Sequence, residues 1–113
     1  MEVTLNDIRE KLELSPICGD TDKEFEGVYV GDLLSRAMSH VEADNLFVTI
    51  MANVNVIAVA SLTEAAAVIL CEDVELPADA LEAANKNEIT VLGTPLSAYE
   101  LCCRIYDITA GRA

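Results

Sequence analysis

Residues 46–71 read LFVTIMANVNVIAVASLTEAAAVILC, and this stretch decides the fold class. It holds no charged residue over positions 46–63, and after Glu64 it stays apolar to its end. That length is sufficient to span a membrane. However, Asn53 and Asn55 lie in its middle, and lysine and arginine are too sparse nearby to set an orientation in a bilayer. We therefore interpret it as a buried strand, a buried helix and a second buried strand, with no membrane partner.

After a first helix over residues 4–14, strand and helix patterns alternate along the chain. Strands are predicted at residues 27–31, 46–51, 66–71 and 89–92, helices at residues 32–41, 53–62, 77–87 and 97–111, and a loop around an edge strand at residues 17–26. Continuous apolar strands that alternate with helices predict a three-layer α/β fold, in which helices flank a mostly parallel sheet. The chain shows no repeat and no linker, so we expect residues 1–113 to form a single domain.

The charge of the chain excludes several classes of partner. Twenty acidic residues stand against seven basic ones, which gives a net charge of −13. A surface this acidic repels the phosphate backbone of nucleic acids and the headgroups of anionic lipids. The first residues carry neither a basic region nor an apolar run, so they do not read as a secretory signal. We expect a cytoplasmic protein that binds no nucleic acid.

The cysteine and glycine patterns argue against a metal, a cofactor or a catalytic role. The four cysteines show no C-x-x-C spacing, and the single histidine, His40, is near none of them in sequence. We expect free, mostly buried thiols. The five glycines are dispersed, which leaves no phosphate-binding loop, and no nucleophile-elbow motif accompanies His40. We therefore predict no bound metal, no cofactor and no enzymatic activity.

Polar side chains at the predicted carboxyl ends of strands form the candidate ligand site. In doubly wound sheets, ligands bind where the loops leave these ends. The candidates are Asp32, Asn53, Asn55 and Thr94. Asp32 is also a candidate helix cap, and one of the two asparagines can cap the helix that follows. The other amide must find a partner if it is buried, because an unpaired buried amide costs roughly 1–3 kcal/mol.

Three segments resemble the DRTGG domain family, which is related in fold to the amino-terminal domain of HPr kinase/phosphorylase. They are GVYVGDLLS at residues 27–35, NVIAVASL at residues 55–62 and LGTPLSAYE at residues 92–100. The family's Asp-Arg signature is missing near residues 53–55, and residues 71–73 read Cys-Glu-Asp where Thr-Gly-Gly is expected. The resemblance implies an α/β regulatory domain without defined activity, often found beside CBS pairs. Stand-alone members occur near iron-hydrogenase components.

Two functions follow as alternatives. The first is a regulatory or ligand-sensing module that binds a small neutral or cationic molecule at the strand ends. The second is an interaction or assembly protein that binds a partner protein, linked to hydrogenase or energy metabolism. In either case we expect a homodimer, because a chain that is 52% hydrophobic has more apolar surface than one small core hides.

Overall fold

The computed structural model describes residues 3–111 and places the elements in strand–helix alternation. They are α1 (Leu5–Leu12), β1 (Ser15–Cys18), β2 (Val28–Val30), α2 (Leu34–His40), β3 (Leu46–Thr49), α3 (Val54–Thr63), β4 (Ala67–Leu70), α4 (Ala78–Lys86), β5 (Val91–Gly93), α5 (Ala98–Tyr106) and a π-helical turn η1 (Asp107–Gly111). No helix among the described residues has the length and hydropathy needed to cross a membrane.

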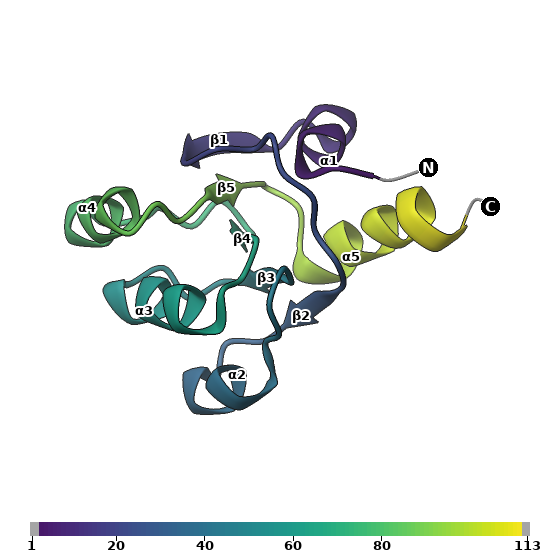
Figure 1. Ribbon diagram of the computed structural model, residues 1–113. Helices are drawn as coiled ribbons and strands as arrows, with labels where there is room; N and C mark the ends of the chain where they lie inside the picture. The colour runs from purple at the N-terminus through teal and green to yellow at the C-terminus, as the bar shows by residue number, and fades with distance from the viewer. Residues whose placement is uncertain (1–2, 112–113) are drawn as a thin grey trace.

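The five strands form one sheet in the order β1-β5-β4-β3-β2. Strands β2 to β5 are parallel, while β1 runs antiparallel to β5, with Ser15 opposite Gly93. In Figure 1, helices α2, α3 and α4 lie on one side of this sheet and α1 and α5 on the other. The predicted α/β architecture, a mostly parallel sheet flanked by helices, is confirmed. The edge strand that was expected near residues 17–26 is β1, and it begins earlier, at Ser15.

The two central strands supply the middle of the core. Every residue of β3 and of β4 is buried, because helices cover both faces of these strands. Successive side chains of β3 point to opposite faces. Phe47 therefore packs in the cluster under α2, α3 and α4, and Leu46 and Val48 pack in the cluster under α1 and α5.

Side chains cap three of the helices. The Thr4 hydroxyl accepts a hydrogen bond from the Asp7 amide, and the Asp7 carboxylate accepts one from the Thr4 amide. These bonds to Thr4 lower the pKa of Asp7. Asn53 accepts from the Val56 amide at the start of α3, as predicted, and Ser97 accepts from the Glu100 amide at the start of α5.

The predicted cap on α2 is wrong. Its N-cap is Leu33, one residue after Asp32, and no side chain bonds the first turn. Asp32 is exposed. The first turn of a helix on the molecular surface can donate its free amides to water, so this helix forms without the carboxylate.

Candidate functional site

The carboxyl ends of the four parallel strands meet at one edge of the sheet, where ligands bind in open α/β folds. Four turns leave this edge, and the turn after β4 differs from the others in backbone conformation. Glu72 and Asp73 are both left-handed, with φ of 61° and 59°. Two successive residues with left-handed backbone conformation cost free energy when neither of them is glycine. Glycine adopts this conformation without steric cost, which fits the Gly-Gly pair that the resemblance to the DRTGG family leads us to expect at these two positions.

The strained turn is bound to the loop that follows β5. The Glu72 amide donates to the Leu96 carbonyl at 3.0 Å, and the Asp73 amide donates to the Thr94 carbonyl at 3.0 Å. Both amides are therefore occupied by the protein itself and are not free to bind an anion. Because the side chains of Glu72 and Asp73 are acidic and exposed, this turn repels a phosphate group that a Gly-Gly turn would tolerate.

A cavity of about 270 Å³ lies beside the turn. It opens to the solvent and is bordered by the strand β1, the end of β5 and the segment between β4 and α4. Its lining residues are Ser15, Ile17, Asp73, Val74, Glu75, Leu76, Gly93 and Thr94. The lining combines two carboxylates with hydroxyl groups and short apolar side chains, so it suits a small ligand that is neutral or positively charged.

Thr94 is the predicted site residue that lines this cavity. It is buried, with 3% of its surface exposed. Its hydroxyl accepts a hydrogen bond from the Leu96 amide at 3.2 Å. Thr49 has the same arrangement at the end of β3, where its hydroxyl accepts from the Met51 amide at 3.1 Å. Thr94 thus shapes the loop after β5 and contributes to the cavity wall at the same time.

The other three predicted site residues lie at the same edge of the sheet but follow strands that do not border the cavity. Asn53 and Asn55 follow β3, and Asp32 follows β2, whereas the cavity lies beside β4, β5 and β1. Asn55 is exposed in the first turn of α3, and its side chain makes no hydrogen bond within residues 3–111. Asn53 is therefore the asparagine that caps the helix, and Asn55, the amide without a cap role, is exposed and needs no partner within the protein.

Sequence reasoning left three polar residues of the cavity, Ser15, Asp73 and Glu75, out of the candidate site. Asp73 and Glu75 were not distinguishable among twenty acidic residues. Ser15 reaches the cavity because β1 pairs with β5, and its segment carries no clear strand pattern. One signal was present, since residues 72 and 73 stand where the DRTGG signature has glycines.

The four cysteines are free, as predicted, but the expectation that they are mostly buried is wrong, because only Cys71 is buried and Cys103 is exposed. Partial or full burial makes three of the thiols less acidic. Burial, together with the nearby Cys102 and Glu72, raises the pKa of Cys71 to about 11. Burial also raises the pKa of Cys102, with Cys103 adding to the effect, and that of Cys18. A protonated thiol is a poor nucleophile and a poor metal ligand. Within residues 3–111, no group of three histidine, cysteine or acidic side chains is placed to hold a metal ion.

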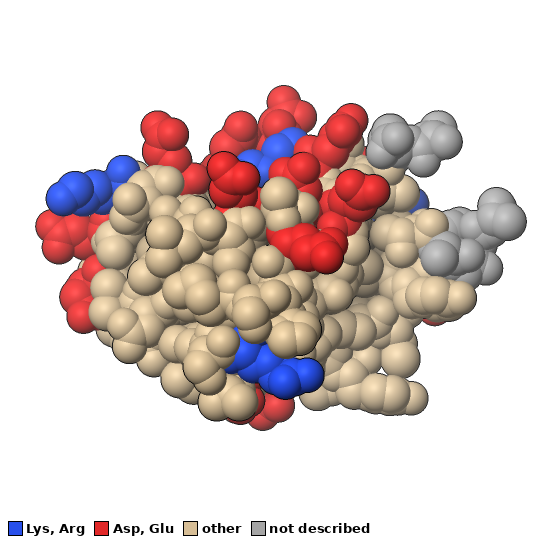
Figure 2. Space-filling model, turned by 60° about the horizontal axis from the view of Figure 1, so that its bottom comes forward, with Lys and Arg blue, Asp and Glu red and all other residues tan. Residues whose placement is uncertain are grey.

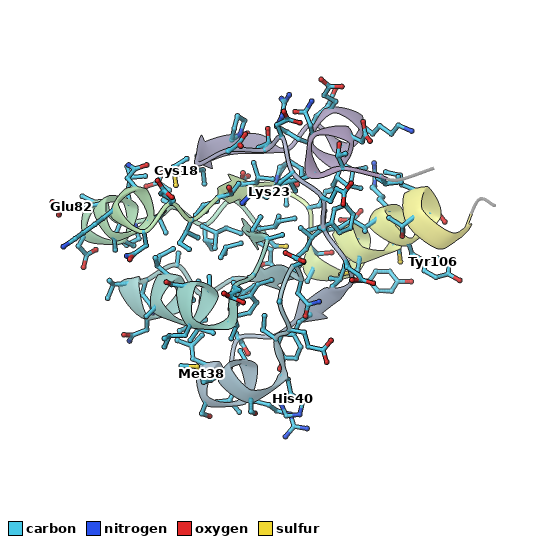
Figure 3. The ribbon with its side chains drawn as sticks, viewed as in Figure 1. Cys18, Lys23, Met38, His40, Glu82 and Tyr106 are labelled. Atoms are coloured by element: carbon cyan, nitrogen blue, oxygen red, sulfur yellow. The ribbon has the colours of Figure 1, made fainter. Side chains whose placement is uncertain are left out.

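A second hollow, of about 550 Å³, lies between α5 and the edge strand β2. It is far more apolar than the cavity at the strand ends. Its lining residues are Val30, Ala98, Tyr99, Cys102, Cys103, Tyr106 and Asp107. Figure 3 shows Tyr106 projecting outward from α5. We call this surface the α5–β2 groove.

The family model described as the DRTGG domain matches residues 7–108. The chain belongs to the DRTGG domain family. No curated protein matches this DRTGG chain.

Among solved structures, the chain is similar to the crystal structure of the CBS and DRTGG domains of the regulatory region of Clostridium perfringens pyrophosphatase, complexed with the activator diadenosine tetraphosphate. The TM-score is 0.73 at 18% sequence identity. The similarity covers 88% of this DRTGG chain and 44% of the pyrophosphatase chain. It shows that the two share a fold over this part.

Proposed function

We propose that this chain is a cytoplasmic, non-catalytic regulatory domain that binds a small neutral or cationic molecule in the cavity beside the Glu72–Asp73 turn. The observation that carries the proposal is the cavity itself, which is walled by a turn with two successive left-handed residues. Backbone strain of this kind is typical of functional sites, where the surrounding structure holds it in place. Membership of the DRTGG family and the regulatory role of the pyrophosphatase neighbour support a regulatory function.

Cavity size and charge argue for a ligand unlike the nucleotide activator of that neighbour. Pockets for drug-sized ligands measure roughly 300–1,000 Å³, and this one measures about 270 Å³. A dinucleotide is too large for it. The two amides of the turn donate to Leu96 and Thr94, and Asp73 and Glu75 place negative charge at the wall. The ammonium group of a small amine can pair with these carboxylates, whereas a phosphate group is repelled by them.

A thermal-shift experiment with putrescine, a small diamine, and ATP tests the proposal at matched ionic strength. We expect putrescine at millimolar concentration to raise the melting temperature by about 2 °C or more, because a ligand that binds only the folded state stabilises it. ATP should leave the melting temperature unchanged. If ATP stabilises the protein and putrescine does not, the proposed ligand class is wrong.

Substitutions separate binding in the cavity from general attraction to an acidic protein. In the double variant Asp73→Asn/Glu75→Gln, the putrescine shift should fall by at least half. The double variant Glu64→Gln/Glu88→Gln is the matched control, because it removes the same number of charges from acidic residues that precede β4 and β5 at the opposite edge of the sheet. It should retain the full shift. If the putrescine shift falls equally in both variants, putrescine is attracted by the net charge of the protein and does not bind in the cavity.

Assembly with a partner protein is the second candidate function, and the α5–β2 groove favours it. Large exposed apolar patches on soluble domains mark interaction sites. Tyr99 is 78% exposed and Tyr106 is 63% exposed, so the groove leaves two large aromatic side chains in water. If no small molecule changes the melting temperature, this function becomes the better explanation of the chain.

A further inference from the structure

The outer face of α5 carries an apolar stripe of which only Cys102 packs against the core. Leu101 and Ile105 point inward and are buried. The outward side has Tyr99, Cys102, Cys103 and Tyr106, which are spaced at i, i+3, i+4 and i+7. This spacing is that of a helix face that packs against another element. The face therefore has the pattern of a buried surface but lacks a cover within residues 3–111.

Strand β2 continues this uncovered surface at the end of the sheet. It pairs with β3 on one side only. Val28 and Val30 point to the same face as α5, because they stand opposite Leu46 and Val48 in the register. They are 38% and 46% exposed.

The outer side of β2 has no neighbouring strand among residues 3–111. The Gly27 carbonyl accepts from the Leu46 amide, and the Gly31 amide donates to the Val48 carbonyl. Groups at residues 27, 29 and 31 thus point toward β3, and those of Val28 and Val30 point away from the sheet, because hydrogen-bonding groups alternate along a strand. An exposed edge of this kind is a template for pairing with another strand.

Charge on the surface decides which partner fits. The loops that precede the parallel strands are strongly acidic and include Glu24, Glu26, Glu42, Asp44, Glu64 and Glu88. In Figure 2, acidic side chains gather along the upper part of the view, while the part toward α2 and β2 is largely uncharged. The α5–β2 groove has one charged residue in its lining, Asp107. A chain of net charge −13 can approach its own copy only through such a surface, whereas a basic partner would be drawn to the acidic loops.

We propose that a second copy of this chain covers the α5–β2 groove. The two β2 strands pair antiparallel about a two-fold axis that passes beside Tyr29, so that Val28 of one copy faces Val30 of the other. This pairing uses the four outward backbone groups of each strand and joins the two sheets into one of ten strands. The outer stripes of the two α5 helices lie on the same face of the joined sheet and pack over the paired valines.

The available area matches that of a small stable dimer. A standard interface buries about 800 Å² on each partner, which is roughly an eighth of the 6324 Å² surface of the chain. A tyrosine buries at least roughly 150 Å², so Tyr99 and Tyr106 supply a large share of it. Val28, Val30 and the rest of the α5 stripe supply more.

Sedimentation of the 113-residue chain at 10–100 µM tests the proposal, and we expect a dimer. Val30→Lys and Tyr106→Lys should each raise the dimer dissociation constant at least tenfold, because each places a charge in the contact. Both side chains are exposed in the monomer, so the fold should survive, as circular dichroism will show. Leu62→Lys is the matched control, since Leu62 is 70% exposed on α3 and should leave the dimer intact. A monomeric wild type, or a dimer that only Leu62→Lys weakens, would overturn the proposal.

Oxidative cross-linking tests the strand pairing itself. A mixture of Val28→Cys chains and Val30→Cys chains should form a disulfide between positions 28 and 30 of different copies. Opposed residues of a hydrogen-bonded antiparallel pair have Cα atoms about 5.5 Å apart, which suits a disulfide. Mass spectrometry identifies the linked peptides. Links between copies through Cys103 alone would show that the copies meet by their helices and that the strands do not pair.

Discussion

The two edges of the sheet are built differently. At the β1 edge, an antiparallel strand is added to β5, and the chain beyond it is bound closely to its neighbours. The Thr90 hydroxyl donates to the Asp20 carbonyl at 2.6 Å, and the Lys23 ammonium donates to the Ala66 carbonyl at 3.0 Å. At the β2 edge, the sheet ends with a strand of three residues, and the side chains of its two valines are exposed. The closed edge holds a polar cavity and the open edge an apolar groove, so we expect a small ligand at the first and a protein at the second.

A matched pair of glycine substitutions gives the largest expected difference between the edges. Gly19 follows β1 with φ of +90°, and Gly27 precedes β2 with φ of +83°. An alanine Cβ at Gly19 would collide with the backbone of Thr90, whereas at Gly27 it would approach the Asn45 amide nitrogen at 2.9 Å. The Asn45 side chain can shift only by weakening its hydrogen bonds to Glu26 and Glu42, and the buried Thr90 backbone cannot shift. Gly19→Ala should therefore cost about 3–4 kcal/mol and Gly27→Ala about 2–3 kcal/mol.

Urea denaturation at one fixed protein concentration measures both free energies of unfolding, because the stability of an oligomer depends on concentration. Equal losses in the two variants would contradict the comparison. They would mean that the chain around β2 is packed as tightly as the chain around β1.

A smaller effect, of opposite sign, is expected at the strained turn beside the closed edge. Glu72→Gly should stabilise the protein by about 1 kcal/mol, because glycine adopts a left-handed φ without steric cost. Glu75→Gly is the control on the same segment. Glu75 is outside the left-handed region, so this change should destabilise the protein by roughly 0.5–1 kcal/mol. If Glu72→Gly also destabilises, the Glu72 side chain makes a contact that outweighs the backbone strain.

Most of the sheet could be predicted from the sequence, because its central strands are buried on both faces. Continuous apolar runs such as residues 66–71 indicate this environment directly. Strand β1 could not be placed in the same way. Its residues include Pro16, which lacks an amide donor and is tolerated at an edge, and the strand exists because β5 offers it a partner far away in sequence.

The parts of the candidate site that depend on hydrogen bonds between residues close in sequence could be predicted. The parts that depend on the packing of distant segments could not. Asn53 caps α3 through a bond to a residue three positions on, and this pattern is visible in the sequence. Asp32 has the residue type of a cap but sits one position too early. The cavity depends on a turn in which acidic residues adopt the conformation of glycine, and residue preferences point away from that conformation.

The smallest expected effect tests how far the ligand site extends from the closed edge toward the open one. The Asn55 side chain is exposed and makes no hydrogen bond within residues 3–111, so Asn55→Ala should change the free energy of unfolding by less than about 0.5 kcal/mol. Asn53→Ala should cost about 0.5–2 kcal/mol, because it removes the α3 cap. If the ligand occupies only the cavity beside β1, Asn55→Ala will also keep the full putrescine shift. A lost shift at unchanged stability would instead extend the site across β4 to β3, where Asn55 would contact the ligand directly.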